Sequence, residues 1–164
     1  MKYVNGTVRR QDRLLDEARA LELVRTCEYG VLSMVTAGGE AYGLPLNYVW
    51  DGHGSLYAHC APEGRKLEAI ACNPSVSFCI VGRTNLLPSR FTTEYESVVM
   101  KCRAAIGLSD DEKRRAISLL IDKLSPDFKE MGEKYAEKSF HRVDVIRLDI
   151  MEYSGKCKVV PPVR

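Results

Sequence analysis

Residues 59–66, His-Cys-Ala-Pro-Glu-Gly-Arg-Lys, bring several side chains that are able to do chemistry into one short stretch. His59 and Cys60 end an apolar run, whereas Gly64, Arg65 and Lys66 begin a stretch with helical character. Four interpretations compete: a cysteine–histidine nucleophile, a metal site, a phosphate-binding helix start and a simple turn.

The nucleophile and the metal site are the weaker interpretations. Neighbouring side chains in a strand point to opposite faces, so His59 cannot act as a base for Cys60, and the cysteine is expected in the core. The other histidines, His53 and His141, form no helical ligand pair with His59, and the sequence has no Cys-x-x-Cys pair. We therefore expect no metal site.

The phosphate interpretation rests on the helix that Gly64 is expected to begin. Free backbone N–H groups and the helix dipole favour an anion at such an end, and Lys66 or Arg65 supplies a positive charge. Many solvated helices also begin with a glycine and a basic residue, so both readings stay open on these residues alone.

Two predicted strands carry polar residues where a core strand would not. Tyr95 and Ser97 share one face of the stretch 92–107, while Glu94 and Glu96 share the other. Asn47 interrupts the apolar stretch 42–50 and needs a partner if it is buried. The pattern indicates either an edge strand with a wet face or a polar ligand laid across the sheet.

The elements that must position these residues are mostly strands joined by short turns. A small, mainly β, six-stranded antiparallel barrel with peripheral helices accounts for this order. The stretch 83–91 is expected to be a loop, and the whole chain, 1–164, is expected to be one domain with loose ends at about 1–10 and 156–164. Strands are predicted over 29–36, 42–50, 55–60, 75–82, 92–107 and 142–155, and helices over 16–27, 63–73, 109–124 and 127–138.

Composition excludes several classes of protein. A net charge of +2 does not favour nucleic-acid binding, and no apolar run is long enough to span a membrane. The N-terminus lacks an apolar signal core, so a cytoplasmic protein is expected, and its six cysteines are then expected to be reduced.

Several motifs together resemble the flavin-binding split-barrel proteins related to pyridoxamine 5′-phosphate oxidase, and most of all their nitroimidazole-resistance branch. They are "EYGVLSMV", "YGLPLNYVW", "LYAHCAPEGRKLEAIACNPSVSFCIVG" and "FTTEYESVV", within a resemblance that runs from about Arg9 to Ser154. The resemblance implies a six-stranded split barrel and a homodimer with FMN at its interface.

The same resemblance assigns roles to individual residues. It implies that Lys66 and Gly64 meet the flavin phosphate and that His59 is the functional residue. The remaining flavin-lining positions that it implies are Ser33, Leu46, Asn47 and Tyr48, together with Tyr95, Glu96 and Ser97.

The function implied is an FMN-dependent oxidoreductase or nitroreductase of the nitroimidazole-resistance type, which takes electrons from a small-molecule donor and passes them to a small-molecule acceptor. FAD is an alternative cofactor. The basic strand motif that holds substrate phosphate in pyridoxamine phosphate oxidases proper is not found. A non-catalytic flavin carrier or sensor is one alternative function, and a haem protein with His59 or His141 on the iron is another.

Overall fold

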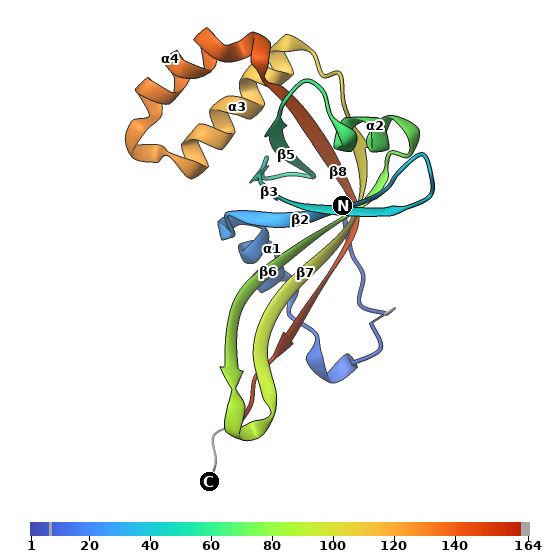
Figure 1. Cartoon of the computed structure of the whole chain (residues 1–164). Helices are drawn as coiled ribbons and strands as arrows, with labels where there is room; N and C mark the ends of the chain where they lie inside the picture. Colours follow the sequence, from blue (N-terminus) through green and yellow to red (C-terminus); the bar gives the residue numbers. More distant parts are fainter. Residues whose placement is uncertain (7, 162–164) are drawn as a thin grey trace.

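The computed structural model describes residues 1–6 and 8–161 and is built around one curled sheet (Figure 1). Its eight strands include the path β3-β2-β6-β7-β8-β5-β4, in which all neighbours are antiparallel, and β1 pairs in parallel with β8. The strands are β1 (Lys2–Tyr3), β2 (Tyr29–Val35), β3 (Ala41–Asn47), β4 (Val49–Trp50), β5 (Ser55–Cys60), β6 (Ser75–Leu87), β7 (Thr92–Ala105) and β8 (Asp144–Lys158).

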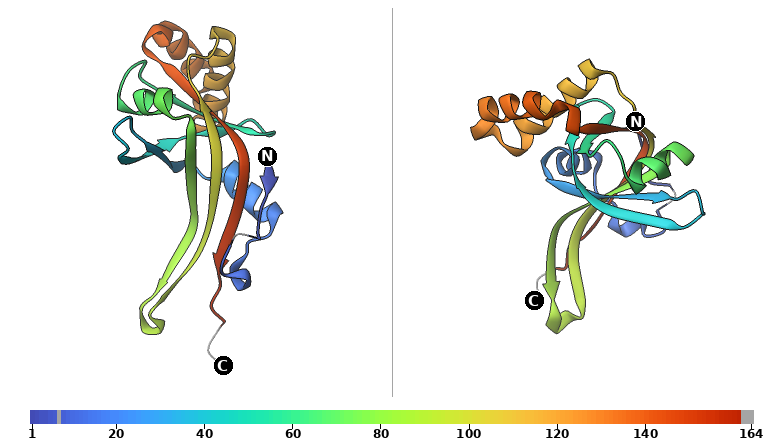
Figure 2. Two further views of the ribbon diagram at one scale, coloured as in Figure 1. Left: turned by 90° about the vertical axis from the view of Figure 1, so that its right-hand side faces the viewer. Right: turned by 45° about the horizontal axis from the view of Figure 1, so that its top comes forward.

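The sheet must curl because its two end strands are consecutive in the chain. β3 and β4 occupy opposite ends of the strand order, yet only Tyr48 separates them. Tyr48 is fully buried at this corner, where its ring meets Phe78 edge-on with centroids 5.2 Å apart. The prediction of an antiparallel barrel with peripheral helices is confirmed, and Figure 2 shows the curl from two further directions.

Two apolar clusters hold the fold together. The larger fills the barrel with alternate residues of the strands, among them the predicted Ile146, Leu148 and Ile150 of β8. The smaller cluster lies on the other side of β4, β5 and β8, where Val49, Tyr57, Ala116, Leu120 and Val145 pack beneath a helix. That second cluster matters for function because it places a helix beside the strand that carries His59.

The four predicted helices are present: α1 (Glu17–Thr26), α2 (Arg65–Cys72), α3 (Asp110–Leu124) and α4 (Lys129–Ser139). Asp16 caps α1 through the amide of Arg19, as its position in the sequence predicts. The Ser109 hydroxyl likewise accepts from the amide of Glu112, but the Glu112 carboxylate binds Arg147 and Tyr57 instead of completing a capping box.

The prediction of a loop over 83–91 is wrong for its first half. β6 continues to Leu87 and pairs with β7 as a long arm that leaves the barrel (Figure 1), with a register irregularity between Val81 and Thr84. Polar and exposed residues in this segment hid a strand that is held by backbone pairing rather than by burial.

The predicted loose ends also need correction. Lys2–Tyr3 and Lys156–Lys158 belong to strands that pair with their neighbours, so these residues are ordered by the sheet. The predicted tail beyond 161 lies outside the described residues. The stretch 42–50 forms two strands, and β1 was not expected, so the sheet has eight strands rather than six.

Candidate functional site

His59 and Cys60 lie at the end of β5 and point in opposite directions. The His59 side chain is exposed, while Cys60 is buried in the barrel core, where desolvation raises the pKa of its thiol. A buried, protonated thiol that points away from His59 cannot serve as a nucleophile with His59 as its base. The interpretation of Cys60 as a core residue is therefore confirmed.

The start of α2 has the geometry of an anion site. Gly64 precedes the helix with a φ of 125°, in the region that favours glycine, and no atom lies within 4 Å of the position that a Cβ would take. The amides of Arg65 and Lys66 then stand at the first two helical positions, where no intrahelical partner exists. This open corner leaves room for a ligand beside free donors.

The two basic residues of this turn have different surroundings. Arg65 pairs with Glu40 at 3.0 Å, and its guanidinium carbon lies 4.6 Å from the centroid of the Tyr42 ring. Lys66 is half-buried, and the described part of the chain offers it no ion-pair partner within 4.0 Å. Arg65 therefore fixes α2 to the β2–β3 hairpin, whereas Lys66 keeps its charge available.

The β2–β3 hairpin presents Ser33 and Asn47 on the outer face of the barrel. Ser33 is paired with Gly43 and Asn47 with Tyr29, and all four residues are exposed. The side-chain amide of Asn47 donates a hydrogen bond to the Glu28 carbonyl at 3.1 Å. A Cβ on Gly43 would meet Ser33 and Val31 at 3.7–3.8 Å. The absence of that Cβ leaves a shallow strip on the sheet surface.

Leu46 and Tyr48 belong to the interior instead. Leu46 packs against the barrel core, and the Tyr48 hydroxyl donates to the Val24 carbonyl at 2.8 Å. Because the Tyr48 side chain is fully buried, only its backbone is available to a ligand. The structure thus separates the stretch 46–48 into two core side chains and one outward amide.

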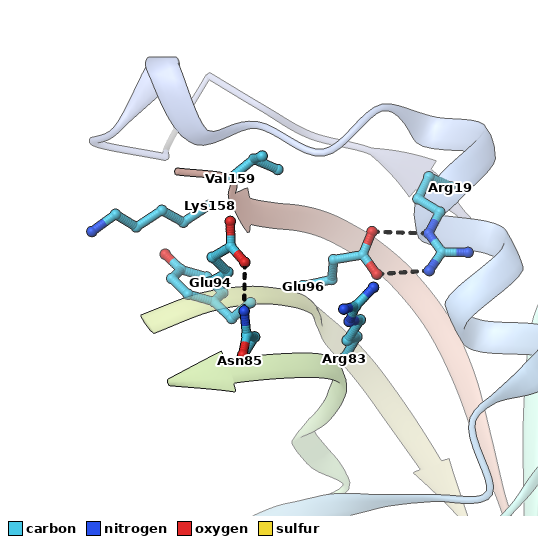
Figure 3. Close-up of a pocket in the computed structure, with 8 residues that line it drawn as sticks. Arg19, Arg83, Asn85, Glu94, Glu96, Lys158 and Val159 are labelled. Atoms are coloured by element: carbon cyan, nitrogen blue, oxygen red, sulfur yellow. Dashed lines mark hydrogen bonds and ion pairs between the residues drawn. The ribbon is translucent and has the colours of Figure 1, made fainter. Parts of the chain in front are cut away.

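Tyr95 and Glu96 line a cavity of about 340 Å³ on the arm, shown in Figure 3. Both nitrogens of one edge of the Arg19 guanidinium bind the Glu96 carboxylate, at 2.9 and 2.6 Å. This hydrogen bonding lowers the pKa of Glu96. The carboxylate is already satisfied within the chain, so it is poorly suited to contact a ligand directly.

Within one chain, the candidate residues do not form one site. Gly64, Lys66 and Ser33 lie near the β2–β3 hairpin, whereas the cavity of Tyr95 and Glu96 lies along the arm, which runs away from α2 (Figure 1). Ser97 pairs with Val81 where the arm leaves the barrel, and it shares the outer sheet face with Val99.

The exposed apolar surface of the outer sheet face was missed from the sequence. Large apolar side chains on β2, β6 and β7 are exposed on this face, although the same strands supply the barrel core from their other face. The sequence of β2 contained the signal for this surface, because it places apolar residues on both faces of the strand. That pattern is typical of a strand covered on both sides. We call this surface the outer apolar face; it consists of Tyr29, Val31, Val35, Val81 and Val99.

His59 faces a different space, a groove of about 250 Å³ between β5, α3 and α4. Among the described residues, no cluster of three or more histidine, cysteine or acidic side chains could hold a metal ion. Nor does that part of the chain contain a helix both long enough and apolar enough to cross a membrane.

Residues 16–157 match the family model described as pyridoxamine 5′-phosphate oxidase. The chain belongs to this family. No curated protein has a sequence that matches the chain.

Solved structures of the same fold include several with flavin in their descriptions. A candidate 5-nitroimidazole antibiotic resistance protein from Bacteroides thetaiotaomicron is 19% identical, with a TM-score of 0.70 over 88% of this chain and 86% of that one. An FAD- and haem-binding protein from Mycobacterium smegmatis is 18% identical, with a TM-score of 0.75 over 93% and 76%. An FAD-binding protein from Mesorhizobium loti is 22% identical, with a TM-score of 0.62 over 90% and 98%. At these identities the likeness concerns the fold.

Proposed function

We propose that this protein is a homodimeric FMN-binding flavoprotein and an FMN-dependent oxidoreductase of the nitroimidazole-resistance type. The observation that carries the proposal is the open start of α2 near the β2–β3 hairpin, where the amides of Arg65 and Lys66 are free donors and the Lys66 ammonium has no ion-pair partner among the described residues. The flavin descriptions of structures that share the fold give further support.

The donors at α2 suit a phosphate monoester. Two free amides and the positive end of the helix dipole favour an anion, and the Lys66 ammonium adds a charge-assisted hydrogen bond. Arg65 is held by Glu40 and Tyr42, so it serves to position the turn. FMN ends in such a phosphate, whereas in FAD the phosphate is esterified further and needs more room beyond α2.

The outer sheet face suits the flavin ring. Gly43 leaves a shallow strip beside Val31 and Ser33, on which a flat ring system can lie close to the backbone. Ser33 and Asn47 supply a hydroxyl and an amide at its edge, as hydrogen-bonding groups for polar ring atoms. This arrangement is apolar under the ring and polar around it, as small-molecule sites commonly are.

A second copy of the chain explains two features that one copy leaves unexplained. The outer apolar face would be covered, and contiguous apolar patches of this kind commonly mark interfaces. The arm, which runs away from its own α2, would reach toward the partner and bring Tyr95 and Glu96 to a shared cavity. The same operation would place the partner's arm at this chain's flavin.

Bound FMN would supply the electron-transfer chemistry, while the protein binds, orients and tunes it. His59 is the proposed catalytic residue, because its exposed imidazole can hydrogen-bond an acceptor and deliver a proton. If His59 has no such role, the same site fits a carrier or sensor that holds flavin without turnover.

The first test is the absorption spectrum of the purified protein, followed by titration of the apoprotein with FMN and FAD. We expect a flavin spectrum and tighter binding of FMN. Lys66→Ala should weaken FMN binding by about 1.5–3 kcal/mol, or at least roughly tenfold, since it removes a charge-assisted contact. Arg65→Ala is the matched control from the same turn and should cost less.

Unchanged FMN affinity in Lys66→Ala would reject the phosphate assignment, and a Soret band in place of a flavin spectrum would identify a haem protein. Enzyme and carrier are separated by anaerobic mixing with a reduced nicotinamide and a nitroaromatic acceptor. The oxidoreductase proposal expects bleaching of the flavin and consumption of the acceptor, with His59→Ala sparing FMN binding and slowing turnover.

A further inference from the structure

We infer that the groove between β5, α3 and α4 is a second binding site, for a neutral, largely apolar molecule of one or two rings whose hydrogen-bond acceptor faces His59. The inference names the class of small molecule that meets His59. It rests on the proposed function for the reaction of that molecule, but its binding is tested independently of flavin.

The groove is built from three elements around the His59 imidazole. β5 provides His59, α3 provides an apolar wall and α4 provides the opposite side. The volume is about 250 Å³. The lining residues are His59, Ile117, Leu120, Ile121, Leu124, Ser125, Gly132, Tyr135, Ala136, Ser139 and Val143.

Gly132 keeps this space open where a larger residue would close it. It lies inside α4, where glycine destabilises a helix by roughly 1 kcal/mol relative to alanine. A Cβ there would lie 3.1 Å from Ile121 Cγ2 and 3.4 Å from two further Ile121 carbons. The missing side chain therefore allows α4 to approach α3 closely while leaving the groove unfilled.

The charge of the lining selects a neutral ligand. It includes no carboxylate, ammonium or guanidinium group; the groups able to form hydrogen bonds are His59, Tyr135 and the hydroxyls of Ser125 and Ser139. A cation buried against such walls would lose hydration without gaining a counter-charge, and the guanidinium of Arg142 is already engaged by the Ser139 hydroxyl. A carbonyl or similar acceptor can instead take a hydrogen bond from the imidazole.

The buried hydroxyl of Ser139 strengthens this view. Ser139 is only 4% exposed, and apart from tyrosines and cysteines it is the one polar residue of the described chain that is so fully buried. Its Oγ accepts a hydrogen bond from Arg142 at 3.3 Å, which leaves its own proton free to be donated. A second donor therefore stands in the same apolar groove as His59.

The volume limits the ligand to a small molecule. Sites for drug-sized ligands commonly enclose about 300–1,000 Å³, so a groove near 250 Å³ suits one or two fused rings rather than a whole flavin or a haem. The groove is lined by residues of β5, α3 and α4, whereas the outer apolar face is formed by β2, β6 and β7, so different side chains line the two surfaces.

One wall of the groove is lightly anchored. Ser139 is the single buried residue of α4, whereas Met131 and Tyr135 are exposed together with Phe128, the residue just before the helix. An element with so little buried surface adjusts at low cost in free energy. We expect α4 to close on the ligand and to bury part of Tyr135.

The test uses 2-methyl-1,4-naphthoquinone, a neutral two-ring molecule with carbonyl acceptors, and its charged counterpart 1,4-naphthoquinone-2-sulfonate. Binding to the flavin-free protein is measured by calorimetry and by ligand-observed NMR. We expect the neutral quinone to bind at least about tenfold more tightly than the sulfonate, and Gly132→Leu to weaken its binding by a similar factor. Met131→Leu, on the exposed side of α4, is the control and should bind normally.

FMN titration of the same variants keeps the two proposals apart. Gly132→Leu should bind FMN as the parent protein does, so loss of quinone binding with intact FMN binding supports the groove. Equal quinone affinity in Gly132→Leu and the parent, or preference for the sulfonate, would overturn it. If Gly132→Leu fails to fold, Ala136→Leu is the second variant that fills the same groove. Hydrogen exchange of α4, measured with and without the quinone, then shows whether the quinone binds beside this helix. Absence of FMN binding with groove binding retained would reject the proposed function alone.

Discussion

The ammonium group of Lys123 lies 3.9 Å from the centroid of the buried Tyr48 ring. The same group donates a 2.6 Å hydrogen bond to the carbonyl oxygen of Cys27, the residue that ends α1. Lys123 therefore fastens the end of α3 to the end of α1 and to the corner between β3 and β4. Burial lowers the pKa of Lys123 to about 8, because desolvation outweighs the charges of Cys27 and Glu28 that favour the ammonium.

The first prediction concerns the stability of the protein in alkaline solution. A lysine whose pKa falls from 10.5 to about 8 on folding binds fewer protons in the folded state, so it makes folding more favourable as pH rises between these values. Relative to Lys123→Met, the parent should gain about 1–2 kcal/mol between pH 8 and pH 10.5, after allowance for the partial exposure of the ammonium. Urea unfolding at several pH values measures the difference.

The comparison with Lys123→Met is needed because neighbouring groups act in the opposite sense. Burial raises the pKa values of Cys27 and Tyr48, so both oppose folding as pH rises. The Tyr48 contribution is present in both proteins and cancels in the difference, whereas the Cys27 contribution does not cancel fully, because the Lys123 charge lowers the pKa of Cys27 and is missing in Lys123→Met. A difference that stays constant from pH 7 to pH 10.5 would show that Lys123 keeps its ordinary protonation.

The second prediction contrasts two glycines of the β2–β3 hairpin. A Cβ on Gly30 would lie 2.4 Å from the Phe78 ring and 2.8 Å from the Cys79 carbonyl, whereas the contacts of Gly43 begin at 3.7 Å. Gly30→Ala should therefore destabilise the protein by about 1–3 kcal/mol through overpacking. Gly43→Ala should change stability by less than about 0.5 kcal/mol, and thermal unfolding of the pair decides.

Gly43 also tests the proposed flavin surface. Gly43→Val would place a branched side chain on the strip beside Ser33 and Val31, where the ring is proposed to lie. FMN affinity should fall by at least about tenfold while the fold is kept. Normal FMN binding by a folded Gly43→Val protein would move the ring to another surface.

The sequence was sufficient to predict the elements that alternate or repeat clearly. The six principal strands and four helices follow from period-two and helical patterns, and the caps of α1 and α3 from Asp16 and Ser109. The continuation of β6 into the arm escaped prediction because Arg83 and Asn85 read as loop residues, whereas the β7 strand of the arm was predicted. The strands of the arm are held by backbone hydrogen bonds to each other, which leave little trace in the side chains.

The candidate site was only partly predictable for a related reason. Local sequence fixes the open turn at Gly64 and the outward direction of His59, since both depend on neighbours in the chain. The roles of Tyr48 and Glu96 depend on distant partners, Val24 and Arg19, and no local pattern reports such contacts. The groove beside His59 likewise depends on how α4 packs against α3.

The third prediction concerns the Arg19–Glu96 pair. Its hydrogen bonds lower the pKa of Glu96 in the folded state, so the pair stabilises folding above the ordinary carboxyl pKa, and this contribution is lost as pH falls through the lowered value. Glu96→Gln should therefore have a lower free energy of unfolding than the parent at pH 7, and the difference between the two proteins should shrink toward pH 3. Chemical unfolding of both proteins at the two pH values tests the change; an equal difference at both would exclude a role for the charge.

The last prediction tests the proposed dimer through the outer apolar face. Val99 is the exposed member of this face on β7, in line with Cys79 on β6 and Val31 on β2. A carboxylate there remains hydrated in a monomer but would be buried without a counter-charge in a dimer. Val99→Glu should therefore leave the barrel folded and shift the protein to a monomer, as measured by light scattering and circular dichroism.

Flavin binding should follow the oligomeric state. If the arm of one copy completes the flavin site of the other, the Val99→Glu monomer should bind FMN at least about tenfold more weakly than the parent. Met131→Glu, at an exposed position on α4, introduces the same charge away from the outer apolar face and should change neither property. A Val99→Glu protein that remains dimeric would place the interface elsewhere. A monomer with undiminished FMN affinity would show that a single chain holds the complete flavin site, with Tyr95 and Glu96 outside it.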